Sequence, residues 1–204
     1  GRGRKGTGMI ANQLKSLVLE TLVNPAQAAR AVLAYAVPGQ AVWLALVLIA
    51  VLNGLYYSML LPGLASAGLI SQQLVSAPLM VALFIVVVFF GMVGLTTLAG
   101  RFLGGTGDFE RIGKMTVWLQ ALRFGAQVAI SLLSLVAPFL GWIASTVLGL
   151  WGLWIVFNFV AEAHAFSIPK AVGALVMTFF GLVMILSILS AILGLAPPVP
   201  NGEI

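Results

Sequence analysis

The stretch LMVALFIVVVFFGMVGLTTL, residues 79–98, decides the fold. It holds no charged side chain and is long enough for a helix to cross about 30 Å of hydrocarbon. Four more apolar runs of similar length predict further spans at residues 41–61, 115–136, 142–161 and 171–195. Segments such as Pro62-Gly63 and Ala137-Pro138 separate the runs, and helices avoid such residues in their interior. The sequence therefore predicts an all-α integral membrane protein with five transmembrane helices.

The composition excludes a water-soluble globule. The 204 residues are 61% hydrophobic and only 7% charged, whereas a soluble domain carries about 25% charged residues. A net charge of +5 would suggest nucleic acid in a soluble chain, but here we expect no nucleic-acid partner because the charges flank membrane spans. The chain has no cysteine, which rules out disulfides, thiolate metal sites and cysteine nucleophiles.

The basic residues predict the orientation of the spans. Nine of the ten Lys and Arg residues fall on one side of the five predicted spans: Arg2, Arg4, Lys5, Lys15, Arg30, Arg101, Arg111, Lys114 and Lys170. Basic residues near span ends stay in the cytoplasm. We therefore expect a multi-pass protein of the bacterial inner membrane with a cytoplasmic N-terminus and a periplasmic C-terminus.

The N-terminal part predicts a surface segment before the first span. We expect residues 1–8 to be an upstream extension or a cloning remnant and see no signal peptide. In residues 9–38, helically spaced apolar side chains predict a cytoplasmic, interfacial amphipathic helix, and Asn24-Pro25 with Gln27 predicts the start of a second helix that ends near Tyr35. Residues 39–196 form the membrane domain, and 197–204 a short external tail.

The third predicted span carries a polar stripe, with side chains three or four residues apart: Thr116, Gln120, Arg123, Gln127, Ser131 and Ser134. The small residues Ala121, Gly125 and Ala129 fall on the opposite face, which permits close approach of a neighbouring helix. We favour hydrogen bonding of the stripe to other spans. The candidate partners are Asn53, Asn158, Ser187 and Ser190. A path for water or a solute is the alternative.

Arg123 is the only charged residue well inside a span, so it needs a partner or water. Glu162 is the nearest candidate by depth, and Glu110 is second. We favour an ion pair that holds helices together over a proton relay, because relays use chains of titratable groups and only one carboxylate lies near that depth.

Two further motifs have structural interpretations. Gly141, Ser145 and Gly149 recur every fourth residue, which predicts close packing against another helix or a second copy. Glu162 and His164 stand two residues apart and would need Asp108 or Glu110 to complete a metal site, so we favour a polar helix end and predict no metal.

The glycine-rich loop at residues 104–108 invites comparison with phosphate-binding loops. Gly113-Lys114 is followed by Met115, where a Walker motif has Ser or Thr. We therefore expect a turn whose Asp108 caps a helix beginning near Phe109.

Four segments together resemble the Yip (Ypt/Rab-interacting protein) membrane family, bacterial branch: Asn24-Pro25, Ala28-Ala29-Arg30, residues 104–109 and residues 159–166. The resemblance covers about residues 14–195 and implies five membrane helices, a cytoplasmic N-terminus and an external C-terminus. Eukaryotic relatives bind Rab-type GTPases. This sequence lacks their long cytoplasmic N-terminal domain, which argues against GTPase binding. For bacterial members the resemblance implies no established reaction.

The functional expectation is a non-enzymatic scaffold or accessory subunit of a larger inner-membrane complex, without a cofactor. No pattern pairs a nucleophile with a base, and five acidic residues and one histidine leave little for catalysis. The expected partners are membrane lipids and other membrane proteins or a second copy of the chain. The alternative is a small transporter or channel that uses the polar stripe. A third possibility, the handling of a lipid or quinone, is supported only by aromatic residues and interfacial basic charge.

Overall fold

The computed structural model describes residues 2–67 and 78–192, and all regular structure in these ranges is helical. Five of the helices are long and apolar enough to cross a membrane. They are α3 (Gly39–Ser66), α5 (Pro78–Phe102), α6 (Phe109–Val136), α7 (Pro138–His164) and α8 (Ile168–Ile192). The predicted all-α fold with five long apolar helices is confirmed.

One predicted boundary is wrong, because Pro62-Gly63 does not end the first span. α3 continues through Pro62 to Ser66. A proline inside a helix removes one backbone donor, but membrane helices tolerate it where nearby hydroxyl groups take up freed carbonyls. In α3 the carbonyl that Pro62 leaves free is that of Ser58, one turn earlier, and the helix continues past it. The remainder of the predicted loop, from residue 68 to 77, and the external tail lie outside the described residues.

The start of α6 follows the prediction closely. Asp108 has an extended backbone, and its side chain accepts a hydrogen bond from the Arg111 amide at 2.7 Å. An N-cap of this kind satisfies one of the free N–H groups of the first turn. As a result α6 begins at Phe109, six residues before the apolar run, and carries polar and membrane-spanning residues on one continuous helix.

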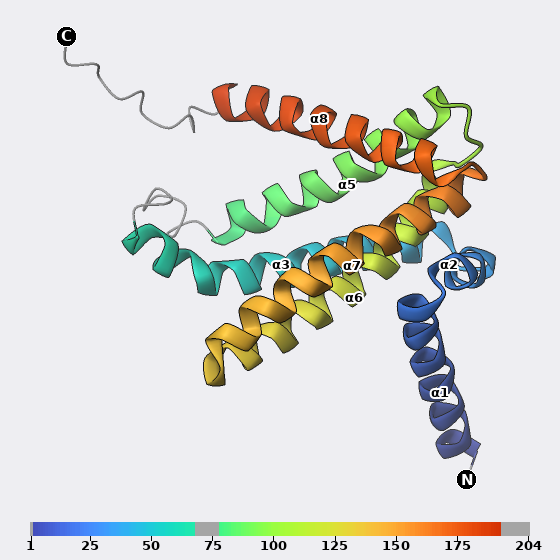
Figure 1. Ribbon diagram of the computed structural model, residues 1–204, viewed down its shortest axis with the longest axis horizontal. Coiled ribbons are helices and arrows are strands. Elements are labelled where there is room, and N and C mark those ends of the chain that lie inside the picture. Colours follow the sequence, from blue (N-terminus) through green and yellow to red (C-terminus); the bar gives the residue numbers. More distant parts are fainter. Residues whose placement is uncertain (1, 68–77, 193–204) are drawn as a thin grey trace.

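The spanning helices form two pairs on either side of α3. α5 packs against α8, α6 packs against α7, and α3 contacts both α5 and α6. In Figure 1 the two pairs meet where α7 passes into α8 and diverge toward the other end. Buried residues that join the helices include Leu46, Phe89, Val93, Ile112 and Phe159. Among these five helices α6 is the least enclosed, since only 6% of the residues in its apolar window are buried.

The N-terminal helices lie beside the closed end of this arrangement. α1 (Arg2–Val23) runs crosswise to the spanning helices, and α2 (Pro25–Ala34) follows it directly (Figure 1). The Asn24 side chain caps α2 by accepting from the Gln27 amide at 3.4 Å, as predicted. α1 already begins at Arg2, so residues 2–8 belong to this helix. Its placement on a membrane surface stays a prediction.

Two tryptophans attach the end of α1 to the α6–α7 pair. The indole N–H of Trp118 donates to the Thr21 hydroxyl at 3.1 Å, and that of Trp151 donates to the Leu22 carbonyl at 3.0 Å. Thr21 is fully buried. Tryptophan suits such a place because its ring is apolar while its N–H needs an acceptor. The last turn of α1 is therefore fixed to the bundle.

Candidate functional site at the charged end

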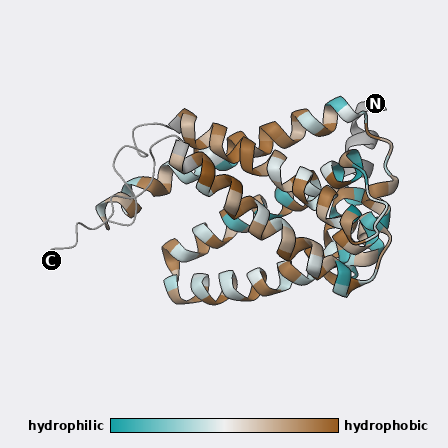
Figure 2. Ribbon diagram, turned by 90° about the horizontal axis from the view of Figure 1, so that it is seen from above, coloured by the Kyte–Doolittle hydropathy of each residue, from teal (hydrophilic) through white to brown (hydrophobic). Residues whose placement is uncertain are grey.

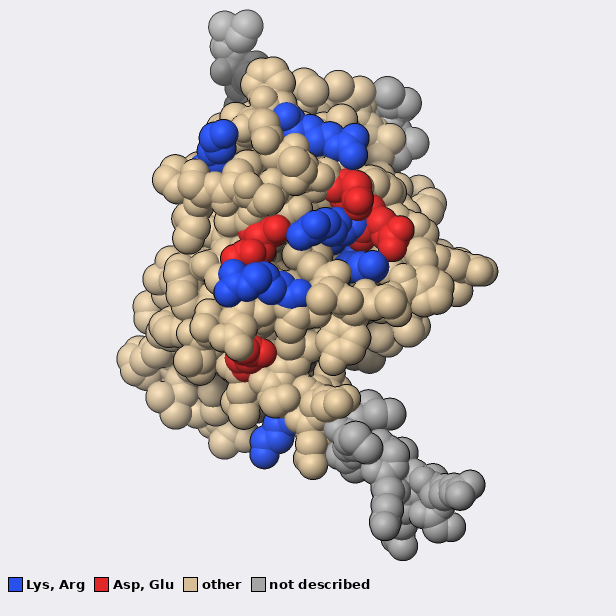
Figure 3. Space-filling view, turned by 90° about the vertical axis from the view of Figure 1, so that its right-hand side faces the viewer, with Lys and Arg blue, Asp and Glu red and all other residues tan. Residues whose placement is uncertain are grey.

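The charged side chains gather where the helices meet. The end of α5, the starts of α6 and α8, the end of α7 and helix α2 supply these residues: Arg30, Arg101, Asp108, Glu110, Arg111, Lys114, Glu162 and Lys170. Figure 2 shows hydrophilic residues at this end and mainly hydrophobic residues along the spans, and Figure 3 shows basic and acidic side chains interspersed on one face. We call this region the charged end.

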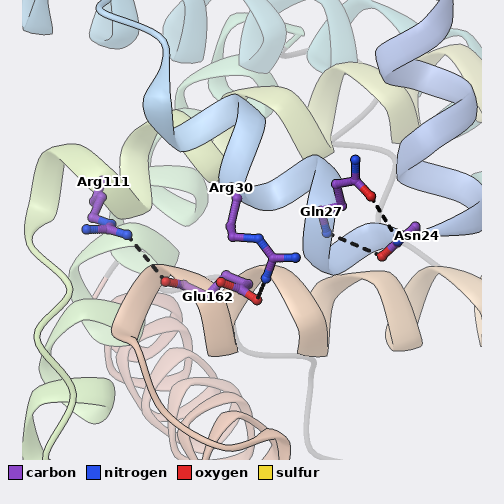
Figure 4. A network of polar contacts seen from close by, with 5 residues as sticks. All are labelled: Asn24, Gln27, Arg30, Arg111 and Glu162. Atoms are coloured by element: carbon purple, nitrogen blue, oxygen red, sulfur yellow. Dashed lines mark hydrogen bonds and ion pairs between the residues drawn. The ribbon is translucent and has the colours of Figure 1, made fainter.

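Glu162 connects three helices at the charged end. Its carboxylate accepts a hydrogen bond from the Arg30 guanidinium on α2, and its backbone carbonyl lies 3.4 Å from an Arg111 nitrogen on α6 (Figure 4). The side chain of Arg30 is 61% exposed and that of Glu162 is 27% exposed. The pair therefore lies at the surface, where ion pairs contribute little stability.

The predicted ion pair between Arg123 and Glu162 or Glu110 is not formed. Among the described residues Glu162 pairs with Arg30, and Glu110 pairs with Lys114 one turn away at 3.1 Å. Both carboxylates stay at the charged end. Arg123 lies fourteen residues into α6, about 21 Å from its start at 1.5 Å per residue. Arg123 therefore lies too far along α6 from the charged end to pair with either carboxylate.

Arg123 is instead hydrogen-bonded by three neutral amides. Its guanidinium donates to Gln120 at 2.6 Å, to Gln127 at 3.0 Å and to Asn53 of α3 at 2.7 Å. Asn53 is fully buried, and its own amide donates to the Ile49 carbonyl. Arg123 itself is exposed. The three amides hold the guanidinium at its own depth, so the stripe ties α6 to α3 as the sequence analysis expected.

The other residues of the polar stripe are bonded to α3, bonded within α6 or buried. Tyr56 of α3 is hydrogen-bonded to Ser131, the Ser134 hydroxyl donates to the Ile130 carbonyl, and Thr116 is buried. Two proposed partners do not take part. Asn158 donates to the Trp154 carbonyl of its own helix, and Ser187 is exposed on α8. The side chain of Ser190 lies outside the described residues.

The small residues divide into two groups. A Cβ on Gly141 would overlap Ser134, so this glycine permits close contact of α6 and α7. By contrast, nothing lies within 4 Å of a Cβ on Gly149 or Gly125. Their neighbours along the same faces are exposed as well: Ala121, Ala129 and Ser145. Of these positions, Gly141 alone makes the predicted close approach to another described helix, and the described residues leave the other faces uncovered.

His164 is the most enclosed polar side chain at the charged end. It is fully buried at the last residue of α7, and a Cβ on Gly100, Gly105 or Gly107 would overlap its ring. The Gly107 amide donates to its Nδ1 at 3.2 Å, so the neutral ring carries its proton on Nε2. Among the described residues Nε2 has no hydrogen-bond partner.

The glycine loop after α5 is thus built around the histidine. Besides the bond to Nδ1, the Thr106 amide donates to the His164 carbonyl at 3.0 Å, and Arg101 donates to the Gly107 carbonyl at 3.1 Å. Gly104 has a φ of 85°, which favours glycine. The sequence pattern alone did not connect the loop with the histidine. The available signal was a loop of closely spaced glycines and the single histidine on the same predicted side.

This arrangement has the character of a structural junction. In the parts of the chain that the structure describes, no group of three or more His, Asp or Glu side chains lies close enough to hold a metal ion. The polar groups at the charged end bond to backbone or to each other across α2, α5, α6 and α7.

The family model described as Yip1 domain matches residues 19–191. The chain belongs to the Yip1 domain family. The match extends from the last turns of α1 to the end of α8, close to the range of the predicted resemblance. It therefore includes α2, the glycine loop and the charged end. No curated protein and no solved structure matches the chain.

Proposed function

We propose that this Yip1 domain protein is a non-catalytic scaffold or accessory subunit of a larger complex in a bacterial inner membrane, and that the open face of α6 binds a partner membrane protein. The proposal assigns no reaction to the chain. The charged end would face the cytoplasm, as the distribution of basic residues predicts.

One observation carries the proposal: a polar, weakly enclosed helix in an otherwise apolar bundle. α6 has the lowest hydropathy of the five spans, and 6% of its window is buried within the chain. The face with Ala121, Gly125 and Ala129 is exposed. Small residues let two membrane helices approach closely and gain dispersion contacts. This face suits a partner helix.

The polar stripe supports packing over transport. Arg123 donates to Gln120, Gln127 and Asn53, and Ser131 is bonded to Tyr56. A path for a solute needs polar groups that are free to exchange their partners. The bonds to Asn53 and Tyr56 join α6 to α3, and the bonds to Gln120 and Gln127 lie within α6. This favours a structural role for the stripe and leaves the opposite face for binding.

Single-cysteine cross-linking tests the proposal, because the chain has no cysteine of its own. Gly125→Cys and Ala129→Cys would place a thiol on the open face of α6. Leu83→Cys is the matched control, since Leu83 lies on α5 and is 64% exposed. Each variant is treated with a short thiol-reactive cross-linker in native membranes, purified in mild detergent and analysed by mass spectrometry.

We expect the α6 variants to form one defined adduct with another membrane protein and the control to form none. Equal, diffuse labelling from all three positions would contradict the proposal. A cross-link between two copies of the chain would also contradict it and would favour the channel alternative, in which a second copy completes the path.

A further inference from the structure

One face of α7 bears two hollows in line. The first is lined by Val147, Leu150, Trp151 and Trp154, and the second includes Asn158, Ala161, Glu162 and Ala165. Apart from Ala165, which follows the last residue of α7, these residues recur at helical spacing, with two adjacent positions in some turns. They therefore share one side of α7. The two hollows follow each other along α7 from mid-helix to the charged end, and we call this side of the helix the α7 groove.

The first hollow, at mid-helix, is the apolar half of the α7 groove. Its four lining side chains are all exposed by at least 40%, from Trp154 at 40% to Leu150 at 67%. The only polar atom of Trp151, the indole N–H, is already bonded to the Leu22 carbonyl. The end of α1 therefore borders the groove, and the surface that remains suits a hydrocarbon chain.

The second hollow, at the charged end, has a volume of about 340 Å³ and lies between α2, α7 and the start of α8. It is lined by Ala26, Asn158, Ala161, Glu162, Ala165, Phe166, Ser167 and Ile168. Ala165 adopts the left-handed conformation with a φ of 54°. This turn ends α7 and brings Phe166 and Ser167 to the wall of the hollow.

The polar side chains that line the second hollow are Asn158, Glu162 and Ser167, and the cation Arg30 lies next to Glu162. Asn158 is 9% exposed, and its amide nitrogen is bonded to the Trp154 carbonyl, which leaves the amide oxygen to accept. The Glu162 carboxylate accepts from Arg30 of α2, whose side chain is 61% exposed (Figure 4). Such an exposed ion pair is weak. A ligand that carries both a cation and an anion can therefore pair with Glu162 through the first and with Arg30 through the second.

The length of the groove matches one membrane leaflet. Fifteen residues separate Val147 from Glu162, which corresponds to about 22 Å at 1.5 Å per residue. Half of a bilayer, headgroups included, is about 20–22 Å thick. A ligand that fills the groove must therefore be apolar over most of this length and polar at one end.

We propose that the α7 groove binds one phospholipid with a primary-amine, zwitterionic headgroup. The ammonium group would donate to Glu162 and Asn158, the phosphate would pair with Arg30, and an acyl chain would lie along Trp154 and Trp151. A primary ammonium has N–H donors for these oxygens, whereas a quaternary ammonium has none, and a glycerol headgroup brings no cation to Glu162.

Lipid competition tests this site on the full chain. The protein is purified in mild detergent, incubated with equal amounts of phosphatidylethanolamine, phosphatidylcholine and phosphatidylglycerol, and examined by native mass spectrometry. We expect phosphatidylethanolamine to be retained about tenfold more than either competitor, because hydrogen bonds to charged groups have this order of strength.

Three variants separate the headgroup from the chain. Glu162→Gln and Asn158→Leu should reduce phosphatidylethanolamine to the level of the competitors, and Trp154→Ala should lower the retention of all three lipids. Thr146→Ala is the matched control, because Thr146 is exposed on another side of α7 and bonds only to the Trp142 carbonyl of its own helix among the described contacts. Thermal unfolding of each variant shows that it is folded.

Equal retention of the three lipids by the unchanged protein would overturn the proposal. So would an unchanged preference in both Glu162→Gln and Asn158→Leu, since the second variant leaves the Arg30 pair intact. Leu150→Cys adds a further check: a cross-link from this position to another protein chain would mean that a helix occupies the groove instead of a lipid. This test is independent of the α6 face, because none of its variants lies on α6.

Discussion

His164 and Arg123 are two polar side chains that the same apolar bundle accommodates in different ways. His164 is fully buried, and backbone atoms of Gly100, Gly105 and Gly107 surround its ring. Arg123 is exposed and is held by side-chain amides alone. Backbone cannot move aside without moving α5 or the glycine loop, whereas amide side chains can change rotamer. The first site therefore tolerates little change, and the second tolerates more.

The sharpest test adds one methyl group against the histidine. Gly100→Ala should lower the free energy of unfolding by about 3 kcal/mol, because the new Cβ overlaps the His164 ring and overpacking is costly. Gly149→Ala is the matched control, also inside a helix but with nothing within 4 Å, and should leave stability unchanged or slightly higher. Thermal and denaturant unfolding in detergent measure both.

A double variant assigns the effect of Gly100→Ala to its proposed cause. The double variant Gly100→Ala/His164→Ala should lose less stability than the sum of the two single losses, since the ring that the methyl group overlaps is gone. If the two single effects simply add, the contact between Gly100 and His164 is not the reason.

The next test removes the hydrogen-bond acceptor of the histidine. His164→Leu leaves the buried Gly107 N–H without a partner, whereas the side-chain oxygen of His164→Asn can still accept. We expect His164→Leu to be less stable than His164→Asn by about 2 kcal/mol. Amide hydrogen exchange at Gly107 should rise in the Leu variant only. Equal exchange in both variants would contradict the proposed bond.

Changes at Arg123 should cost less. Arg123→Gln removes an unpaired charge from a span, which offsets the lost bond to Asn53, and the free energy of unfolding should change by less than about 1 kcal/mol. Arg123→Leu should be somewhat worse, because the buried Asn53 oxygen then lacks its donor. A loss at Arg123→Leu larger than at His164→Leu would reverse the comparison between the two sites.

The smallest effect is expected at the exposed ion pair. Glu162→Gln should lower the free energy of unfolding by about 0.5 kcal/mol at low salt, because Arg30 is largely exposed. The difference from the unchanged protein should shrink further as salt is raised, since salt screens exposed charges. Unfolding midpoints at two salt concentrations measure this, and a large, salt-independent loss would mean that the pair is shielded from water.

Local signals in the sequence predicted much of the fold. The apolar runs predicted the number of long apolar helices, and Asn24 and Asp108 predicted two helix starts, because capping depends on a few adjacent residues. The predicted end of the first span at Pro62 was wrong. A proline indicates an interruption from local chemistry alone, whereas the surroundings of the helix decide whether it continues.

The candidate sites were predicted only in part. The polar stripe and its partner Asn53 follow from helical periodicity and from the scarcity of polar groups in spans. The choice of Arg30 as the partner of Glu162 and the contact of His164 with three glycines do not, because they depend on how α2 and the glycine loop lie across the ends of α5, α6 and α7.

The sequence by itself determined that this membrane protein has five long apolar helices and that nine of its ten basic residues flank them on one side, because an apolar run of fixed length and the cost of burying charge are local quantities. Only the tertiary structure decided that the α6–α7 pair diverges from α5–α8, which faces stay open and which residues line the α7 groove. Between apolar helices in an apolar solvent the pairing depends on shape complementarity and a few hydrogen bonds, and these arise between residues far apart in the chain.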